Sequence, residues 1–219
     1  MRRVLFFAIG VVLLWSCKSA VSIVDKPIVF NEEREQLTLE YFRERYGLEK
    51  DTPDIIPKMI VLHWTVIPTL QKSFEAFEKP TLPNWRPDIK DVSGLNVSSQ
   101  FMVDRDGTIY RLMPETTMAR HVIGLNHCAI GVENVGGGTG QPLTKAQLKS
   151  NIHLVRYLAE KYAIDYVIGH YEYTLFEDHP LWLEKDSGYR TVKSDPGPEF
   201  MKKVRKAVRD LDFKPLPQK

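Results

Sequence analysis

The segment before the C-terminal helix places a lysine and an aspartate where they can act together. Pro196 disfavours helical backbone at Asp195, so the chain leading to it is expected to run extended. Alternate side chains of an extended chain share a face, so Lys193 and Asp195 should point the same way. Such a pair is commonly a surface ion pair of little energetic effect. It can also form one wall of a site, in which the carboxylate binds a metal ion and the ammonium meets developing negative charge.

Two histidines are expected at the ends of buried strands. Residues 59–65 are apolar, partly β-branched and bounded by prolines, which predicts a strand that carries His63. Residues 166–170 predict a shorter strand that ends at His170. Two imidazoles and the carboxylate of Asp195 would fill three corners of a tetrahedron around zinc and leave the fourth for water, as in hydrolytic sites. The spacing is not a compact ligand motif, and a single histidine of this kind is more often a satisfied core residue.

A glutamate interrupts another apolar strand. Residues 129–135 predict a strand with Gly131 and Glu133 on one face. A carboxylate in a buried strand is costly unless it has a partner. Glu133 therefore requires an explanation, and a buried ion pair with Lys193 is one of them.

The remaining pattern predicts the frame around these residues. Strands that alternate with helices, together with one hairpin, indicate an α/β fold: a central mixed β-sheet flanked by helices. The capping box Thr144–Gln147 should open a helix with Leu148, Ile152, Val155, Ala159 and Tyr162 on its buried stripe. The other expected elements are helices over 32–46, 69–78 and 198–211, a hairpin over 101–112 and a long loop over 79–96 that walls a cleft.

Length and charge fit one soluble domain with short extensions. The chain has 219 residues, of which 43% are hydrophobic and 26% charged. A formal charge of +2 with no basic face gives no reason to expect a nucleic-acid partner. We expect a monomer.

The N-terminus has the layout of an export signal. Arg2 and Arg3 precede an apolar run, 4–15, that is too short to span a bilayer as a mature helix. Leu14-Trp15-Ser16-Cys17 resembles a bacterial lipoprotein box, which implies a lipid-bearing Cys17 and an exported protein anchored in the cell envelope. The alternative is an ordinary signal peptide with a free cysteine.

These features divide the chain into four parts. They are a lipoprotein-type signal peptide over 1–17, a tether and N-terminal helix over 18–56, a catalytic domain over 57–213 and a tail over 214–219. If residues 1–17 are processed as a lipoprotein, Cys128 is the one thiol without a lipid, so no internal disulfide is expected.

Five segments in order resemble the zinc-dependent N-acetylmuramoyl-L-alanine amidases of the type-2 family, which share their fold with the peptidoglycan recognition proteins. The resemblance implies that His63, His170 and Asp195 bind Zn²⁺, that Glu133 is the general base and that Lys193 supports the oxyanion. It covers roughly residues 57–211, and its segments are 60–65, 101–114, 129–133, 167–170 and 193–198.

Three further residues are expected to line the substrate cleft. His121 occupies the place of a histidine that the family often carries in a Trp-His-x-Gly element, and a purely structural role is its alternative. Trp64 adjoins His63. Gln100 stands where many relatives have a histidine, so a substrate contact there differs. The segment 171–194 between two implied ligands is longer than in common relatives and should reshape the rim of the cleft.

The resemblance implies a zinc amidase that cuts between N-acetylmuramic acid and L-alanine in peptidoglycan or muropeptides. A non-catalytic module that binds peptidoglycan is the alternative from another class. A zinc hydrolase that acts on a different amide is a third reading, because the rim of the cleft is unusual.

Overall fold

A six-stranded mixed sheet runs through the centre of the molecule, as the sequence predicted. The computed structural model describes residues 22–83, 89 and 92–218. The strand order is β1-β4-β3-β5-β2-β6; β3 and β4 pair antiparallel as the expected hairpin, and the other neighbours pair parallel. The strands are β1 Ile23–Asp25, β2 Met59–Trp64, β3 Phe101–Val103, β4 Ile109–Arg111, β5 Ala129–Asn134 and β6 Tyr166–Gly169.

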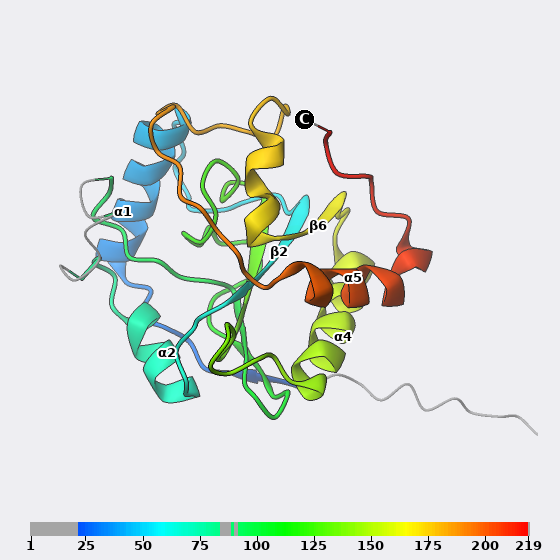
Figure 1. Ribbon diagram of the computed structural model, residues 1–219. Helices are drawn as coiled ribbons and strands as arrows, with labels where there is room; N and C mark the ends of the chain where they lie inside the picture. The colour runs from blue at the N-terminus through cyan, green and yellow to red at the C-terminus, as the bar shows by residue number, and fades with distance from the viewer. Residues whose placement is uncertain (1–21, 84–88, 90–91, 219) are drawn as a thin grey trace, which may run out of the picture.

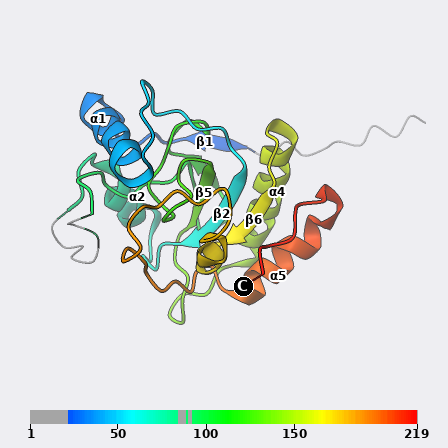
Figure 2. The same cartoon turned by 90° about the horizontal axis from the view of Figure 1, so that it is seen from above.

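Helices cover both faces of this sheet. Figures 1 and 2 show α1 and α2 on one side of the strands and α4 and α5 on the other. The α-helices are α1 Glu32–Tyr41, α2 Leu70–Glu78, α4 Lys145–Lys161 and α5 Pro198–Ala207. A π-helical turn, Phe42–Tyr46, continues α1, and short 3₁₀ helices span His170–Phe176 and Arg209–Leu211.

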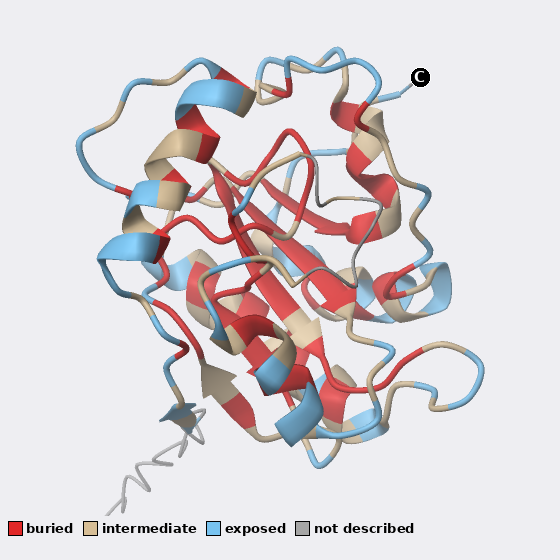
Figure 3. Cartoon of the chain, turned by 90° about the vertical axis from the view of Figure 1, so that its left-hand side faces the viewer, coloured by how far each residue is buried: buried red, intermediate tan, exposed pale blue. Residues whose placement is uncertain are grey.

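Strand alternation divides the core between the two faces. On β2, Ile60 and Leu62 pack toward α4 and α5, whereas Met59 and Val61 pack against the opposite cluster. The central strands are almost wholly buried, as Figure 3 shows. Since His63 follows Val61 by two residues, it lies on the face away from α4 and α5.

The buried face of α4 is wider than the predicted stripe, from which Leu148, Ile152, Val155 and Tyr162 all pack in the core. The fully buried residues are Gln147, Asn151, Leu154, Val155 and Leu158. The Gln147 amide donates to the carbonyls of Val103 and Val135, and Asn151 exchanges hydrogen bonds with Asn134. The apolar pattern missed Gln147 and Asn151 because they are polar: Gln147 satisfies two carbonyls near strand ends, and Asn151 pairs with the side chain of Asn134.

The described part of the segment 18–56 contains the predicted N-terminal helix, α1, and packs against the rest of the molecule. β1 joins the edge of the sheet in parallel register with β4, and Ile28 and Tyr41 are buried. The short β1 is mostly exposed, so it has no hydrophobic alternation by which to recognise it. At the other end, the Lys214 amide donates to the Asp165 carbonyl, which attaches the start of the tail.

The predicted signal peptide and its lipidation site, Cys17, lie outside the described residues. Within the described part, none of the helices combines the length and the apolar character needed to cross a bilayer.

Candidate metal and catalytic site

Two adjacent parallel strands bring the two histidines together. β2 and β6 pair in a register that sets Leu62 opposite Gly169, so the next residues, His63 and His170, fall side by side. Tyr166, Ile168 and His170 alternate onto the face that carries His63. Both histidines are buried, at 1% and 7% exposure. The sheet thus pairs residues that lie 107 positions apart in the chain.

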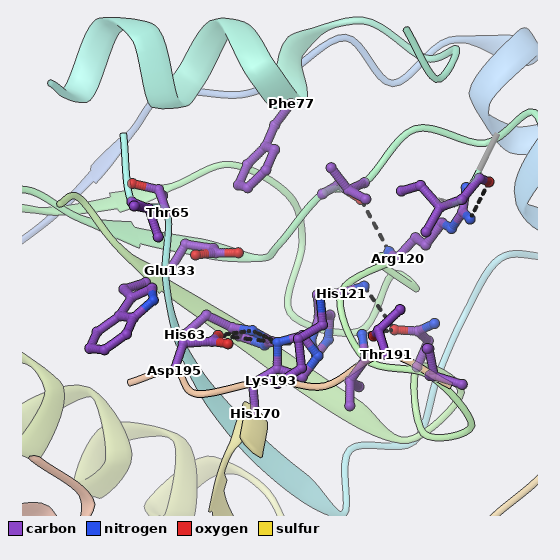
Figure 4. A pocket seen from close by; sticks show the side chains of 18 of the residues that line it. His63, Thr65, Phe77, Arg120, His121, Glu133, His170, Thr191, Lys193 and Asp195 are labelled. Carbon is purple, nitrogen blue, oxygen red and sulfur yellow. Dashed lines mark hydrogen bonds and ion pairs between the residues drawn. The ribbon is translucent and has the colours of Figure 1, made fainter. Parts of the chain in front are cut away.

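Asp195 completes a triangle of metal-ligand atoms. The Tyr171 amide donates to the Asp195 carbonyl, which holds the extended segment beside the end of β6. Oδ2 of Asp195 lies 3.2 Å from Nδ1 of His63 and 3.1 Å from Nδ1 of His170, and the two Nδ1 atoms are 3.0 Å apart (Figure 4). A tetrahedral zinc site with bonds of about 2.0–2.1 Å separates its ligand atoms by about 3.3 Å, so this triangle fits zinc with little movement.

The protonation states in this triangle also suit a cation. Burial opposes the charge of Asp195, but hydrogen bonds with His170 and His63 outweigh it and lower the pKa of the carboxyl far below its usual range. Burial, and then the charge of His63, lowers the pKa of His170 to about 4. At neutral pH the site therefore offers a carboxylate and a neutral imidazole, the forms in which these groups bind metals.

Glu133 and Lys193 adjoin the triangle. Glu133 is the register partner of His63 across β2 and β5, so the two side chains stand next to each other on one face. Lys193 lies close enough to His170 for its charge to contribute to the lowered pKa of that ring. Both residues line the cavity that contains His63, His170 and Asp195, and Figure 4 shows all five around one hollow.

The cavity has a volume of about 360 Å³, within the range of small-ligand sites. The long segment between the implied ligands, 171–194, supplies Tyr189, Thr191, Val192 and Lys193 to its wall, and Ile89 comes from the loop over 79–96. Parts of that loop, 84–88 and 90–91, lie outside the described residues. Val192 is fully exposed, so it presents an apolar side chain at the rim.

His121 also lines the cavity, where the resemblance placed it. Its ring lies against Gly131, where a Cβ atom would approach within 2.8 Å of the imidazole. Glycine at this position of β5 therefore makes room for the ring beside His63. Burial, and then the charge of His63, lowers the pKa of His121 well below its ordinary value, so the ring is neutral at pH 7.

Of the other two residues expected to line the cleft, Trp64 does so and Gln100 does not. Trp64 lines the cavity, and its indole lies on Gly137, where an added Cβ would come within 2.4 Å. Gln100 is fully buried: its amide nitrogen donates to the Thr117 carbonyl, and its oxygen accepts from the Gly131 amide. The expected substrate contact of Gln100 is therefore corrected to a structural role, because both ends of its side chain hold backbone.

Three residues that shape the site were not found from the sequence. Arg120 is buried and donates to carbonyls of the loop over 89–95, including that of Ser93. Asn126 accepts hydrogen bonds from the amides of His121 and Val122, and Asn134 donates to the His63 carbonyl. Each acts on backbone distant in the chain or within an irregular loop, so no periodicity indicates it.

The comparisons agree with this architecture. Residues 51–198 match the family described as N-acetylmuramoyl-L-alanine amidase. No curated protein matches the chain. Among solved structures, the amidase LysC from Clostridium intestinale URNW is 22% identical, with a TM-score of 0.51 over 86% of this chain and 97% of that one.

A selenomethionine derivative of AmpD gives 22% identity and a TM-score of 0.51 over 84% and 93% of the two chains. At such identities these likenesses show the fold alone. The family match, by contrast, spans more than half of the sequence. This chain belongs to the N-acetylmuramoyl-L-alanine amidase family.

Proposed function

We propose that this protein is a zinc-dependent amidase that hydrolyses the bond between N-acetylmuramic acid and L-alanine in peptidoglycan or muropeptides. The observation that carries the proposal is the triangle of donor atoms from His63, His170 and Asp195, with sides of 3.0–3.2 Å. Membership of the amidase family supports the substrate class.

Each residue of the site has a part in the proposed reaction. His63, His170 and Asp195 would hold a zinc ion, which would supply a water of pKa about 7 and polarise the amide carbonyl. Glu133 accepts the proton of the attacking water and returns it to the departing amine of L-alanine. Lys193 places a positive charge near the carbonyl oxygen as it becomes negative. These roles match the arrangement of both side chains on the wall of the ligand cavity.

The test is an assay of the chain without residues 1–17 on purified muropeptides. We expect release of free stem peptide, loss of that release on chelation and recovery on addition of zinc. His170→Ala should bind no zinc and release no peptide. Binding of muropeptides without release would support the recognition module instead. Release that is indifferent to chelation would overturn the metal-dependent mechanism.

We also propose that the protein is exported and anchored in the cell envelope by lipid at Cys17. The basic pair Arg2-Arg3, the apolar run over 4–15 and the box that ends at Cys17 support this location. An enzyme that acts on peptidoglycan would there face its substrate.

A further inference from the structure

His121 lies between a proposed metal ligand and the backbone of β5. Its Nδ1 is 3.0 Å from Nε2 of His63, and its own Nε2 is 3.3 Å from the carbonyl oxygen of Ala129. The His121 and His63 rings are perpendicular, with centroids 5.1 Å apart. Both ring nitrogens of His121 therefore have protein neighbours at hydrogen-bonding distance.

The acceptor at one end of these contacts determines which ring nitrogens of His121, and then of His63, carry a hydrogen. A carbonyl oxygen can only accept, so Nε2 of His121 carries the hydrogen and donates it to Ala129. A neutral imidazole has one N–H, so Nδ1 of His121 is an acceptor. Nε2 of His63 must then be the donor in the contact between the two rings.

When His63 is neutral and donates through Nε2, its remaining nitrogen keeps a lone pair. This Nδ1 is the atom that faces Nδ1 of His170 and Oδ2 of Asp195. A metal-binding histidine needs its other ring nitrogen held by a hydrogen bond, because that bond fixes both the tautomer and the orientation of the ring.

We propose that His121 is a positioning residue that holds His63 in the tautomer whose Nδ1 is free to bind the metal. Two hydrogen bonds make up this relay: one from Nε2 of His63 to Nδ1 of His121, and one from Nε2 of His121 to the Ala129 carbonyl. The inference rests on the metal site of the proposed function, and it is independent of the substrate.

The surroundings of His121 are built for this role. Asn126 accepts hydrogen bonds from the His121 and Val122 amides, at 2.9 and 2.8 Å, which fixes the backbone of the loop. Gly131 leaves the space that the ring occupies, and the Gly131 amide is itself held by Gln100 at 2.7 Å. Since both nitrogens of His121 are engaged, a hydrogen bond from this ring to substrate would require breaking the relay.

The experiment compares zinc affinity in two variants of His121, by competition with a chromogenic chelator. The protein lacks residues 1–17 and keeps the whole described structure. His121→Leu removes the acceptor and should weaken zinc binding by about 10- to 100-fold. In His121→Asn the side-chain oxygen can take the place of Nδ1, so affinity should stay within about threefold of the original. His153→Asn, on α4, is the matched control and should leave affinity unchanged.

A second measurement needs neither metal nor substrate. Nitrogen NMR of the metal-free protein reports which ring nitrogen of His63 carries the hydrogen. We expect Nε2 in the unaltered protein and in His121→Asn, and a mixture of tautomers in His121→Leu. A hydrogen on Nδ1 and none on Nε2 in the unaltered protein, or full zinc affinity in His121→Leu, would overturn the inference. If His121→Leu does not fold, the spectrum of the unaltered protein and the zinc affinity of His121→Asn still test the inference. Failure to release stem peptide bears on the proposed function alone.

Discussion

His63 and Glu133 stand directly opposite each other on the parallel strands β2 and β5, with both side chains on the same face of the sheet. This register sets a proposed metal ligand beside a proposed proton acceptor, and both belong to rigid strands. Catalytic groups held in this way keep their mutual geometry better than groups on loops. The relationship leads to the first prediction.

Glu133→Gln should abolish most of the activity and leave the metal site intact. The amide keeps the shape of the side chain but cannot accept a proton, so kcat should fall by about 10²- to 10⁴-fold. Zinc content should not change, because Glu133 is not one of the three proposed ligands. Turnover of muropeptides and metal analysis of the same sample check this. Glu49→Gln, at an exposed position, is the control. Retained turnover in Glu133→Gln would remove Glu133 from the mechanism.

Lys193→Met should slow the reaction because it removes the charge proposed to face the oxyanion. Loss of one such donor typically costs about a hundredfold in kcat. Lys193→Arg keeps the charge and should recover part of the rate. Steady-state kinetics separate kcat from KM; a change confined to KM would instead indicate a binding role. Lys202→Met, exposed on α5, should have no effect.

The hydrogen-bonded carboxylate of Glu115 should make the free energy of unfolding depend on pH. Burial opposes its ionisation, but hydrogen bonds from Lys161, Tyr162 and Tyr157 outweigh burial and lower the pKa of the carboxyl. Such a carboxylate stabilises the fold above the unfolded pKa of about 4.3, and the stabilisation is lost as pH falls through the lower folded value.

Glu115→Gln should therefore lower the free energy of unfolding by about 2 kcal/mol at pH 7. The difference from the unaltered protein should shrink as pH falls below about 4. Urea unfolding at several pH values measures it. A difference that is constant from pH 7 to pH 3 would contradict the assignment.

Val66→Gly should stabilise the protein. Val66 has a φ of +56°, a region that β-branched residues rarely adopt, and the residue is 65% exposed. Relief of about 2 kcal/mol of backbone strain should exceed about 1 kcal/mol of added chain entropy in the unfolded state. The expected net gain is about 1 kcal/mol in urea unfolding. A loss of stability would show that the side chain contributes more than its exposure indicates. Val192 is exposed but its φ is not positive, so Val192→Gly is the comparison and should not gain stability.

Cys17→Ser in the full chain tests the proposed anchor. Labelled fatty acid should be incorporated into the unaltered protein and the protein should fractionate with membranes. The variant should carry no label, because serine offers no thiol for lipidation. Cys128→Ser is the matched control: Cys128 is buried, and its replacement should leave labelling unchanged. Label that persists in Cys17→Ser would contradict the proposal.

The local pattern was sufficient for the parts of this protein that depend on neighbouring residues. The strands that carry His63 and Glu133, and the strand that ends just before His170, were predicted from apolar, partly β-branched runs. The hairpin and the capping box at Thr144 were predicted from turn and capping chemistry. The grouping of His63, His170 and Asp195 came from the family resemblance, since no spacing rule joins residues so far apart.

Only the tertiary structure decided which long-range hydrogen bonds complete the fold and the site. The buried face of α4 includes Gln147 and Asn151, and Gln100 proved to hold backbone, because a polar side chain can be buried wherever a distant carbonyl or amide satisfies it. The relay through His121 likewise depends on the Ala129 carbonyl and on the space at Gly131. The local sequence determines whether a segment forms a strand or a turn. These hydrogen bonds instead depend on which distant segments the sheet brings together.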